Sequence, residues 1–318
     1  MPSYGGARMT SLEDFLRPTQ KQLFKKLCKN YKGKILFSKG NFILVRGEAP
    51  IMLVAHLDTV HEKPVRDICK TEDKNILMSP QGIGGDDRCG VFTLVKVYSL
   101  AKIKPWLLFC CDEEVGGLGA KKFCLAHKQK QLPKELDQLK CIVEIDRKGK
   151  HDAVYYHCAN SDFEAYITTK GFKTAQGSFS DISLIAPELG IAAVNLSSGY
   201  HHAHTLHEYI NRSELESTIE KVHEIITDAT NPAFSKFEYV ESCVNPYLPQ
   251  NNRLYDNLSI LYDKQNDIPR KIPSELKGIY EALLDFYSLH ELESFRAEYG
   301  DQILWQIYND EIASIYYQ

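Results

Sequence analysis

The sequence predicts an α/β fold: a mixed, mostly parallel central sheet with helices on both faces, followed by a helical C-terminal appendage. Three observations predict it. Apolar runs of strand length alternate with stretches of helical spacing from residue 34 to residue 229. Acidic residues and histidines follow several of these runs, where open α/β sheets place their ligands. The composition changes after Asn231-Pro232.

The first predicted elements are strands with short connections. Residues 34–38, 42–46 and 51–55 are apolar and closely spaced, which predicts strands linked as hairpins. Residues 87–101 have helical spacing, and 106–111 read as a buried strand. The later elements that we expect are a helix at 119–128, strands at 140–146 and 153–157, helices at 161–168 and 181–188, a strand at 191–196 and a helix at 213–229.

The change in composition predicts two domains, a main domain at 1–232 and a helical appendage at 233–318. Residues 244–275 are rich in Asn, Pro, Asp and Lys. Residues 275–299 and 301–316 have helix-like spacing and many aromatic side chains. We expect the appendage to cover a cleft or to mediate homo-oligomer assembly.

Composition limits the classes of partner. A chain of 318 residues that is 43% hydrophobic can bury a large core. Its net charge of -4 and its dispersed basic residues argue against nucleic acid as a partner. No apolar run approaches the roughly 20 residues needed to cross a bilayer, and the first residues lack the regions of a signal peptide. We therefore expect no membrane partner, a cytoplasmic location, and cysteines that are free thiols.

The first candidate site motif is His56-Leu-Asp58. His56 follows an apolar strand, and Asp58 lies two residues later, so both side chains can project from one side of an extended segment. A metal-bound imidazole needs an acceptor on its second nitrogen, which Asp58 can supply. A buried histidine with an unrelated aspartate nearby would show the same pattern.

The second motif is Gly84-Gly85-Asp86-Asp87. The glycines let the backbone approach a bound ion while a carboxylate points into the site. A bridging carboxylate offsets the repulsion between two divalent ions, and we assign this role to Asp86. Asp87 is expected to cap the following helix. An N-cap aspartate without any metal would explain the motif equally well.

The third motif places Glu113 and Glu114 directly after a buried strand. Adjacent carboxylates there are costly unless a cation neutralises them. We expect Glu114 to bind metal, and Glu113 to act as general base and later as general acid. A solvated acidic turn is the alternative.

Two more motifs complete the set. Asp146 ends an apolar strand and is expected to bind a second metal ion. The tract from Tyr200 to Glu208 contains four histidines, a composition that is typical of metal sites. Composition does not decide which of these histidines is a ligand.

Together the five motifs resemble those of the co-catalytic dizinc exopeptidase superfamily, clan MH. The first two are similar to peptidase T and its aminoacylase relatives, and Asp-Asp-Arg-x-Gly is also similar to the motif of the glutamyl aminopeptidases. The resemblance covers residues 50–230. It implies two divalent ions, zinc or, as substitutes, cobalt or manganese. The residues that it implies as metal ligands are His56, Asp86, Glu114, Asp146 and His204.

The resemblance also bears on the remaining site residues. His204 outranks its neighbours because the related families place Ser or Thr next and an acidic residue four positions later, as Thr205 and Glu208 do here. Ser180-Asp181 resembles a Ser-Asp or Thr-Asp pair beside the site of the aminopeptidases. Asp181 is therefore expected to position substrate. The candidates for substrate contact or oxyanion stabilisation are His201, His202 and His207.

The chain departs from both groups of relatives. Peptidase T inserts a lid domain between the fourth and fifth motifs, and the glutamyl aminopeptidases insert a β-domain between the first two. The spacings from Asp146 to His204 and from His56 to Asp86 are too short for either insertion. We therefore expect a catalytic domain without a lid.

The resulting functional prediction is a metal-dependent hydrolase of terminal peptide bonds, most similar to an aminopeptidase, with Glu113 as general base and Asp58 assisting. Its expected partner is a peptide or small amide substrate. The alternatives are a dizinc amidohydrolase, deacylase or carboxypeptidase acting on a non-standard amide. A further alternative is a non-catalytic metal-binding interaction protein.

Overall fold

The computed structural model divides into two compact units, Met1–Val244 and Asn245–Gln318. The described residues are 9–38, 41–61, 63–242, 276, 279, 283, 292, 296 and 300–307. The first unit extends beyond the predicted boundary after residue 232. Phe237 is buried in the core of this unit, and Glu238 pairs with Ile191 in an isolated β-bridge. The segment that follows Asn231-Pro232 therefore packs on the main domain, and the roles of the two predicted domains stay predictions.

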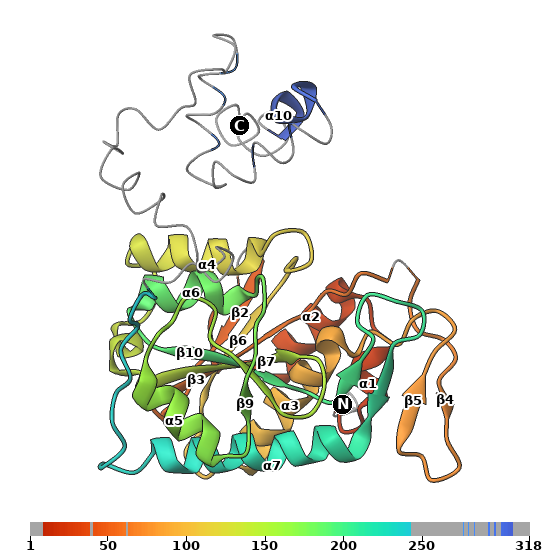
Figure 1. Ribbon diagram of the computed structural model, residues 1–318, viewed down its shortest axis with the longest axis horizontal. Helices are drawn as coiled ribbons and strands as arrows, with labels where there is room; N and C mark the ends of the chain where they lie inside the picture. Colours follow the sequence, from red (N-terminus) through yellow and green to blue (C-terminus); the bar gives the residue numbers. More distant parts are fainter. Residues whose placement is uncertain are drawn as a thin grey trace, which may run out of the picture. The chain divides into compact units, whose positions relative to one another are not determined.

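An eight-stranded sheet forms the centre of the first unit (Figure 1). Its strands, in spatial order, are β1 (Ile35–Phe37), β2 (Phe42–Val45), β6 (Trp106–Cys110), β3 (Ile51–His56), β7 (Cys141–Arg147), β10 (Ala193–Ser197), β8 (Asp152–Val154) and β9 (Lys173–Thr174). Strands β6, β3, β7 and β10 run parallel, and β1 and β2 pair antiparallel with their neighbours. Strand β8 pairs antiparallel with β10 and parallel with β9. The predicted mixed sheet with a parallel centre is confirmed.

Only one of the two predicted hairpins forms. Strands β1 and β2 pair antiparallel, as expected. Strand β6 lies between β2 and β3, so the hairpin predicted for β2 and β3 was wrong. All five residues of β6 are buried, and a strand that is apolar on both faces is stable only in the interior of a sheet.

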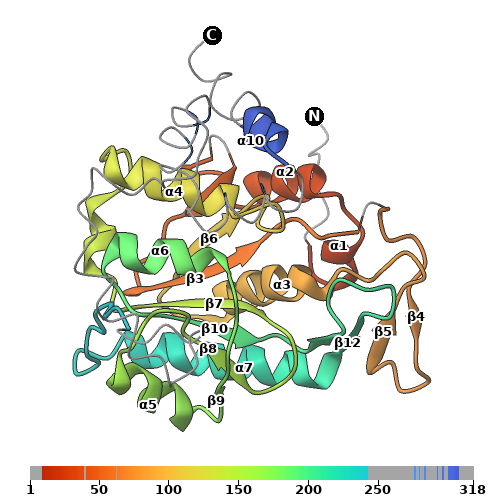
Figure 2. The same ribbon diagram turned by 45° about the horizontal axis from the view of Figure 1, so that its top comes forward.

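Helices cover both faces of the sheet. The elements are α1 (Glu13–Leu16), α2 (Gln20–Asn30), α3 (Gly85–Leu100), α4 (Leu118–Lys128), the 3-10 helix η1 (Lys134–Gln138), α5 (Ser161–Thr169), α6 (Asp181–Leu189) and α7 (Arg212–Ala229). Helices α3 and α7 lie together on one face, and α4 and α6 lie on the other (Figures 1 and 2). Each face has its own cluster of buried apolar side chains.

Helix α3 packs very closely on strand β7. A Cβ atom added at Gly90 would lie 2.1 Å from the carbonyl oxygen of Ile145, so no larger residue fits at this crossing. The close approach brings the start of α3, which carries Asp86, beside the end of β7, which carries Asp146. Local packing therefore places two predicted ligands together.

A second, four-stranded sheet was not predicted. Its order is β11 (Tyr200–His201), β12 (Tyr209–Asn211), β5 (Ile76–Met78) and β4 (Cys69–Lys70), all antiparallel. Strands of two or three residues carry too little periodicity to be recognised in the sequence. This sheet ties the histidine-rich segment to the chain that leads into α3.

Few residues of the second unit are described. Helix α10 (Gln302–Ile307) lies within the helix predicted at 301–316. Most of that helix and most of the helix predicted at 275–299 lie outside the described residues, as does the segment 244–275. Among the described residues, no helix is long and apolar enough to cross a membrane. The cysteines among the described residues all lie in the first unit and are free thiols, most of them buried.

Candidate metal centre and active site

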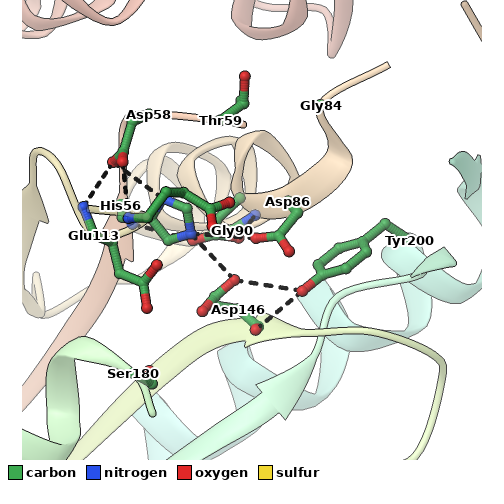
Figure 3. A network of polar contacts seen from close by, with 12 residues as sticks. His56, Asp58, Thr59, Gly84, Asp86, Gly90, Glu113, Asp146, Ser180 and Tyr200 are labelled. Carbon is green, nitrogen blue, oxygen red and sulfur yellow. Dashed lines mark hydrogen bonds and ion pairs between the residues drawn. The ribbon is translucent and has the colours of Figure 1, made fainter. Parts of the chain in front are cut away.

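The five predicted ligands converge at the carboxyl ends of the central strands. His56 is the last residue of β3, and Asp146 lies near the end of β7. Glu114 follows β6, Asp86 lies at the start of α3, and His204 lies in the loop between β11 and β12. Figure 3 shows His56, Asp86 and Asp146 facing one another at this edge. The sheet thus gathers residues that are far apart in the sequence.

Asp86 lies between the two histidines. Its Oδ1 atom is 3.2 Å from Nε2 of His56, and its Oδ2 atom is 3.2 Å from Nε2 of His204. Asp146 Oδ1 lies 3.4 Å from the same His56 nitrogen, and Glu114 Oε2 lies 3.2 Å from the same His204 nitrogen. The ligand atoms form two groups that share the Asp86 carboxylate.

The ionisable side chains of this cluster lie close enough to shift one another's pKa values. Burial raises the pKa of Asp146 well above its usual range, with the charge of Asp86 adding to the effect. Burial also raises the pKa of Glu113 to about 9. Hydrogen bonding to Asp86 raises the pKa of His204 to about 9, and the neighbouring Asp146 charge raises that of His56 despite its burial. When no cation is bound, protons on these side chains offset the negative charge of the carboxylates.

The donor set fits divalent cations. Imidazole nitrogens mixed with carboxylate oxygens suit zinc and several similar ions. The Oε1 atom of Glu114 is buried without a hydrogen-bond partner. Buried carboxylates of this kind are paired or coordinate metals in most proteins. The residues present can therefore accommodate two cations on either side of Asp86.

Asp58 connects His56 to the loop of residues 112–114, which we call the acidic loop. Its Oδ1 atom lies 3.3 Å from His56 Nδ1, as predicted for a residue that orients a ligating imidazole. The same carboxylate accepts hydrogen bonds from the backbone N–H groups of Glu113, at 3.1 Å, and Glu114, at 3.0 Å. This second contact was not predicted. One side chain thus sets the position of a ligand, a candidate base and the first histidine (Figure 3).

The acidic loop is also held from its other side. Asp112 adopts a positive φ of 60° and accepts hydrogen bonds from the side chains of Gln20 and Asn41, at 2.6 and 2.8 Å. A left-handed non-glycine residue needs such support from its surroundings. Helix α2 therefore contributes to the site although none of its residues belongs to a motif.

Buried carboxylates hold the loop that carries Asp86. Glu208 is fully buried and accepts hydrogen bonds from the backbone N–H groups of Gly84, at 3.0 Å, and Asp86, at 2.9 Å. Asp87 accepts from the N–H groups of Gly90, at 2.9 Å, and His56, at 3.2 Å. The predicted capping role of Asp87 is confirmed. The position of Glu208 four residues after His204 was the sequence signal for its role.

Neutral polar residues fix Asp146. The Asn195 side chain accepts from the backbone N–H of Asp146 at 2.8 Å and donates to its carbonyl oxygen at 3.3 Å. The Tyr200 hydroxyl donates to the same carbonyl oxygen at 3.1 Å. Neither residue was predicted, because a single polar side chain within a strand carries no distinguishing signal in the sequence.

The four predicted substrate-binding residues lie in different surroundings. Asp181 is buried at the start of α6, beside the Cys110 thiol, and burial raises its pKa to about 7. His201 pairs with Glu214 at 2.7 Å. The side chains of His201, His202 and His207 have no polar contact with the ligand cluster among the described residues. Their role in substrate contact stays a prediction.

One buried acid was missed. Glu144, on β7, is fully buried and accepts a hydrogen bond from the Ser180 hydroxyl. Its Oε1 atom has no hydrogen-bond partner, and burial raises its pKa well above the usual range. Burial therefore favours the protonated form of both Glu144 and Asp181.

Comparisons with known proteins agree with this geometry at the level of the fold. No family model and no curated protein matches the sequence. Among solved structures, aminopeptidase PepT from Bacillus cereus has a TM-score of 0.51 and 15% identity, over 69% of this chain and 97% of that chain. An aminopeptidase from Desulfurococcus kamchatkensis has a TM-score of 0.50 and 14% identity, over 68% and 93%.

A TET aminopeptidase from a marine sediment thaumarchaeote also has a TM-score of 0.50, with 11% identity over 68% of this chain and 96% of that chain. The chain has the fold of these aminopeptidases. The fold that the five motifs implied is thus confirmed, and the chain matches these structures over nearly their whole length.

The raised pKa values predict how the metal-free protein responds to pH. Folding raises the pKa of Glu113 from 4.5 to about 9 and that of His204 from 6.5 to about 9. A group with a raised pKa stabilises the fold below its unfolded pKa, and this contribution disappears as the pH rises through the folded value. We expect the urea midpoint of the chelator-treated protein to fall between pH 6.5 and pH 9.

Glu113→Gln should make the decrease of the urea midpoint with pH smaller, because it removes one of the titrating groups. The matched control is Glu216→Gln, whose side chain is largely exposed on α7. It should leave the slope unchanged. A midpoint that stays constant or rises over this pH range would contradict the proposed electrostatics.

Proposed function

We propose that this chain is a metal-dependent exopeptidase that removes residues from the amino terminus of peptides. The observation that carries the proposal is the position of Asp86 between His56 and His204, with Glu113 beside them. Two cation positions that share one carboxylate, next to a carboxylate that is not needed as a ligand, suit the hydrolysis of an amide bond.

The proposed metal ligands divide into two groups. His56 and Asp146 would hold one ion, Glu114 and His204 would hold the other, and Asp86 would bridge them. Zinc is the proposed metal, and cobalt or manganese could replace it. When bound, such ions polarise a carbonyl group and lower the pKa of water toward neutrality.

Glu113 is the proposed general base. Its backbone is held by the hydrogen bond to Asp58, while its carboxylate makes no hydrogen bond within the described part of the chain. That carboxylate extends toward Asp146 (Figure 3). A group in this position can take a proton from the attacking water and deliver it to the leaving amine.

Asp58 is proposed as a positioning residue. It keeps the Nδ1 side of His56 paired, so that the Nε2 atom faces Asp86 and Asp146. Through its bonds to the Glu113 and Glu114 N–H groups it also fixes the distance between base and ligand. A displaced base would lose most of the benefit of proximity.

Two observations support action at the amino terminus. The three solved structures compared above are aminopeptidases by name. The side chain of His204 is 54% exposed, so the site opens to solvent on this side and a chain end can approach it. Asp181 remains a candidate for positioning the substrate, since its carboxylate oxygens have no hydrogen-bond partner apart from the Cys110 thiol.

A panel of short peptides with free or N-acetylated amino termini tests the proposed specificity. The zinc-loaded protein should hydrolyse the free peptides and leave the acetylated ones intact, because an aminopeptidase requires the free amine. The released products would be measured by mass spectrometry. Equal turnover of both series would contradict the proposal, and release of acetate would instead indicate a deacylase.

Glu113→Gln tests the proposed base. The substitution keeps the shape of the side chain but removes its ability to take a proton, so turnover should fall at least about 100-fold, within the usual range for general base catalysis. The zinc content and the thermal unfolding midpoint should be retained. Glu216→Gln is again the control and should keep full activity. Unchanged activity in Glu113→Gln would contradict the assignment.

A further inference from the structure

A pocket of about 240 Å³ lies beside the candidate metal centre, on the other side of Asp58. Its walls come from the segment that leads into α2, from the loop after His56, and from the start of α3. The lining residues that matter here are Pro18, Thr19, Asp58, Thr59, Lys63 and Arg88. None of the roles proposed above uses this pocket.

Arg88 is a buried cation on the pocket wall without an adequate partner. Its side chain is 4% exposed. Its Nη1 atom donates hydrogen bonds to the carbonyl oxygens of Phe15, at 2.8 Å, and Pro18, at 2.9 Å. Its Nε atom is buried and has no hydrogen-bond partner. Since a guanidinium offers five donors, two carbonyl contacts leave most of its capacity unused.

The nearby carboxylates do not neutralise this charge. Neither the Asp58 nor the Asp87 carboxylate forms a hydrogen bond or an ion pair with Arg88 in the described part of the chain, and Asp87 already accepts from the N–H groups of His56 and Gly90. The oxygens of Asp58 are already engaged by His56 and by the backbone of the acidic loop. A buried charge in this state is stabilised by any anion that enters the pocket.

Two further features favour an anion. Lys63 is exposed and lines the same pocket, so its ammonium group can reach a ligand bound there. Thr19 is the N-cap of α2, an eleven-residue helix whose first turn contains no acidic residue. The N-terminus of a helix carries a partial positive charge, which attracts anions.

We propose that this pocket binds a carboxylate group of the peptide substrate. The inference rests on the proposed function, because Asp58 lines this pocket and also contacts His56 of the metal centre. A carboxylate bound by Arg88 and Lys63 therefore belongs to a residue close to the scissile bond. It comes from the terminal carboxylate of a very short peptide or from an acidic side chain of a longer one.

Binding of uncleavable analogues to the full, zinc-loaded chain tests this inference independently of turnover. The first pair is an Ala-Ala analogue with CH2–NH in place of the peptide bond, as the free acid and as the amide. The second pair is the amidated analogue with Glu or with Gln at either position. Calorimetry would give each Kd. We expect the carboxylate member of at least one pair to bind about tenfold more tightly.

In Lys63→Ala the ratio of the two Kd values within a pair should fall toward one. In Lys63→Arg the ratio should be retained. The matched control is Lys102→Ala, an exposed lysine that precedes β6 at the opposite edge of the sheet. It should bind like the unmodified protein. Arg88 is left unchanged because its replacement would also release the segment before α2.

The outcomes separate the two proposals. Equal binding of acid and neutral members in both pairs, or a preference that survives Lys63→Ala, would overturn the pocket assignment. A preference that is lost in Lys63→Ala supports it, and the responding pair identifies the source of the carboxylate. If that preference appears while no free peptide is hydrolysed, the proposed peptidase activity fails and the carboxylate site stands.

Discussion

The central constraint on this molecule is the burial of several carboxylates around two histidines at one edge of a sheet. Isolated buried carboxylates are unstable as anions, and those of Asp146 and Glu113 have raised pKa values for this reason. Cations remove the conflict more completely than protons do, because each divalent ion offsets two negative charges. The cluster therefore suits bound cations, and without them protons supply the balancing charge.

Backbone hydrogen bonds make this arrangement possible. Asp58 binds the loop of Glu113 and Glu114, and Glu208 binds the loop of Asp86. Each of these acids accepts two or more donors, which compensates its own burial while it fixes a neighbouring loop. The ligands are thus positioned by loops whose main chain is tied to side chains from other elements. Small changes in these supporting acids are expected to affect the centre as much as changes in the ligands.

The sequence predicted the central sheet and its larger helices because their apolar periodicity is long and regular. It missed β4, β5, β9, β11 and β12, which are too short to show any period, and also α1 and α2. For α2 a signal existed, since Thr19 and Gln22 form a capping box. The insertion of β6 between β2 and β3 depends on long-range pairing, which spacing along the chain does not reveal.

The convergence of the five candidate ligands was predictable because each residue follows a strand or a glycine-rich turn in a recognisable motif. The supporting residues Asn195, Tyr200 and Glu144 were not, because burial and partners make them important and a single sequence shows neither. Arg88 was part of a motif, but only the structure shows its unpaired Nε atom and the pocket beside it.

Anomalous diffraction from crystals grown with zinc would test the central claim most directly. The account predicts two zinc peaks, one between Asp86, His56 and Asp146 and one between Asp86, Glu114 and His204. Crystals in which the protein binds zinc elsewhere, with no peak beside Asp86, would contradict it.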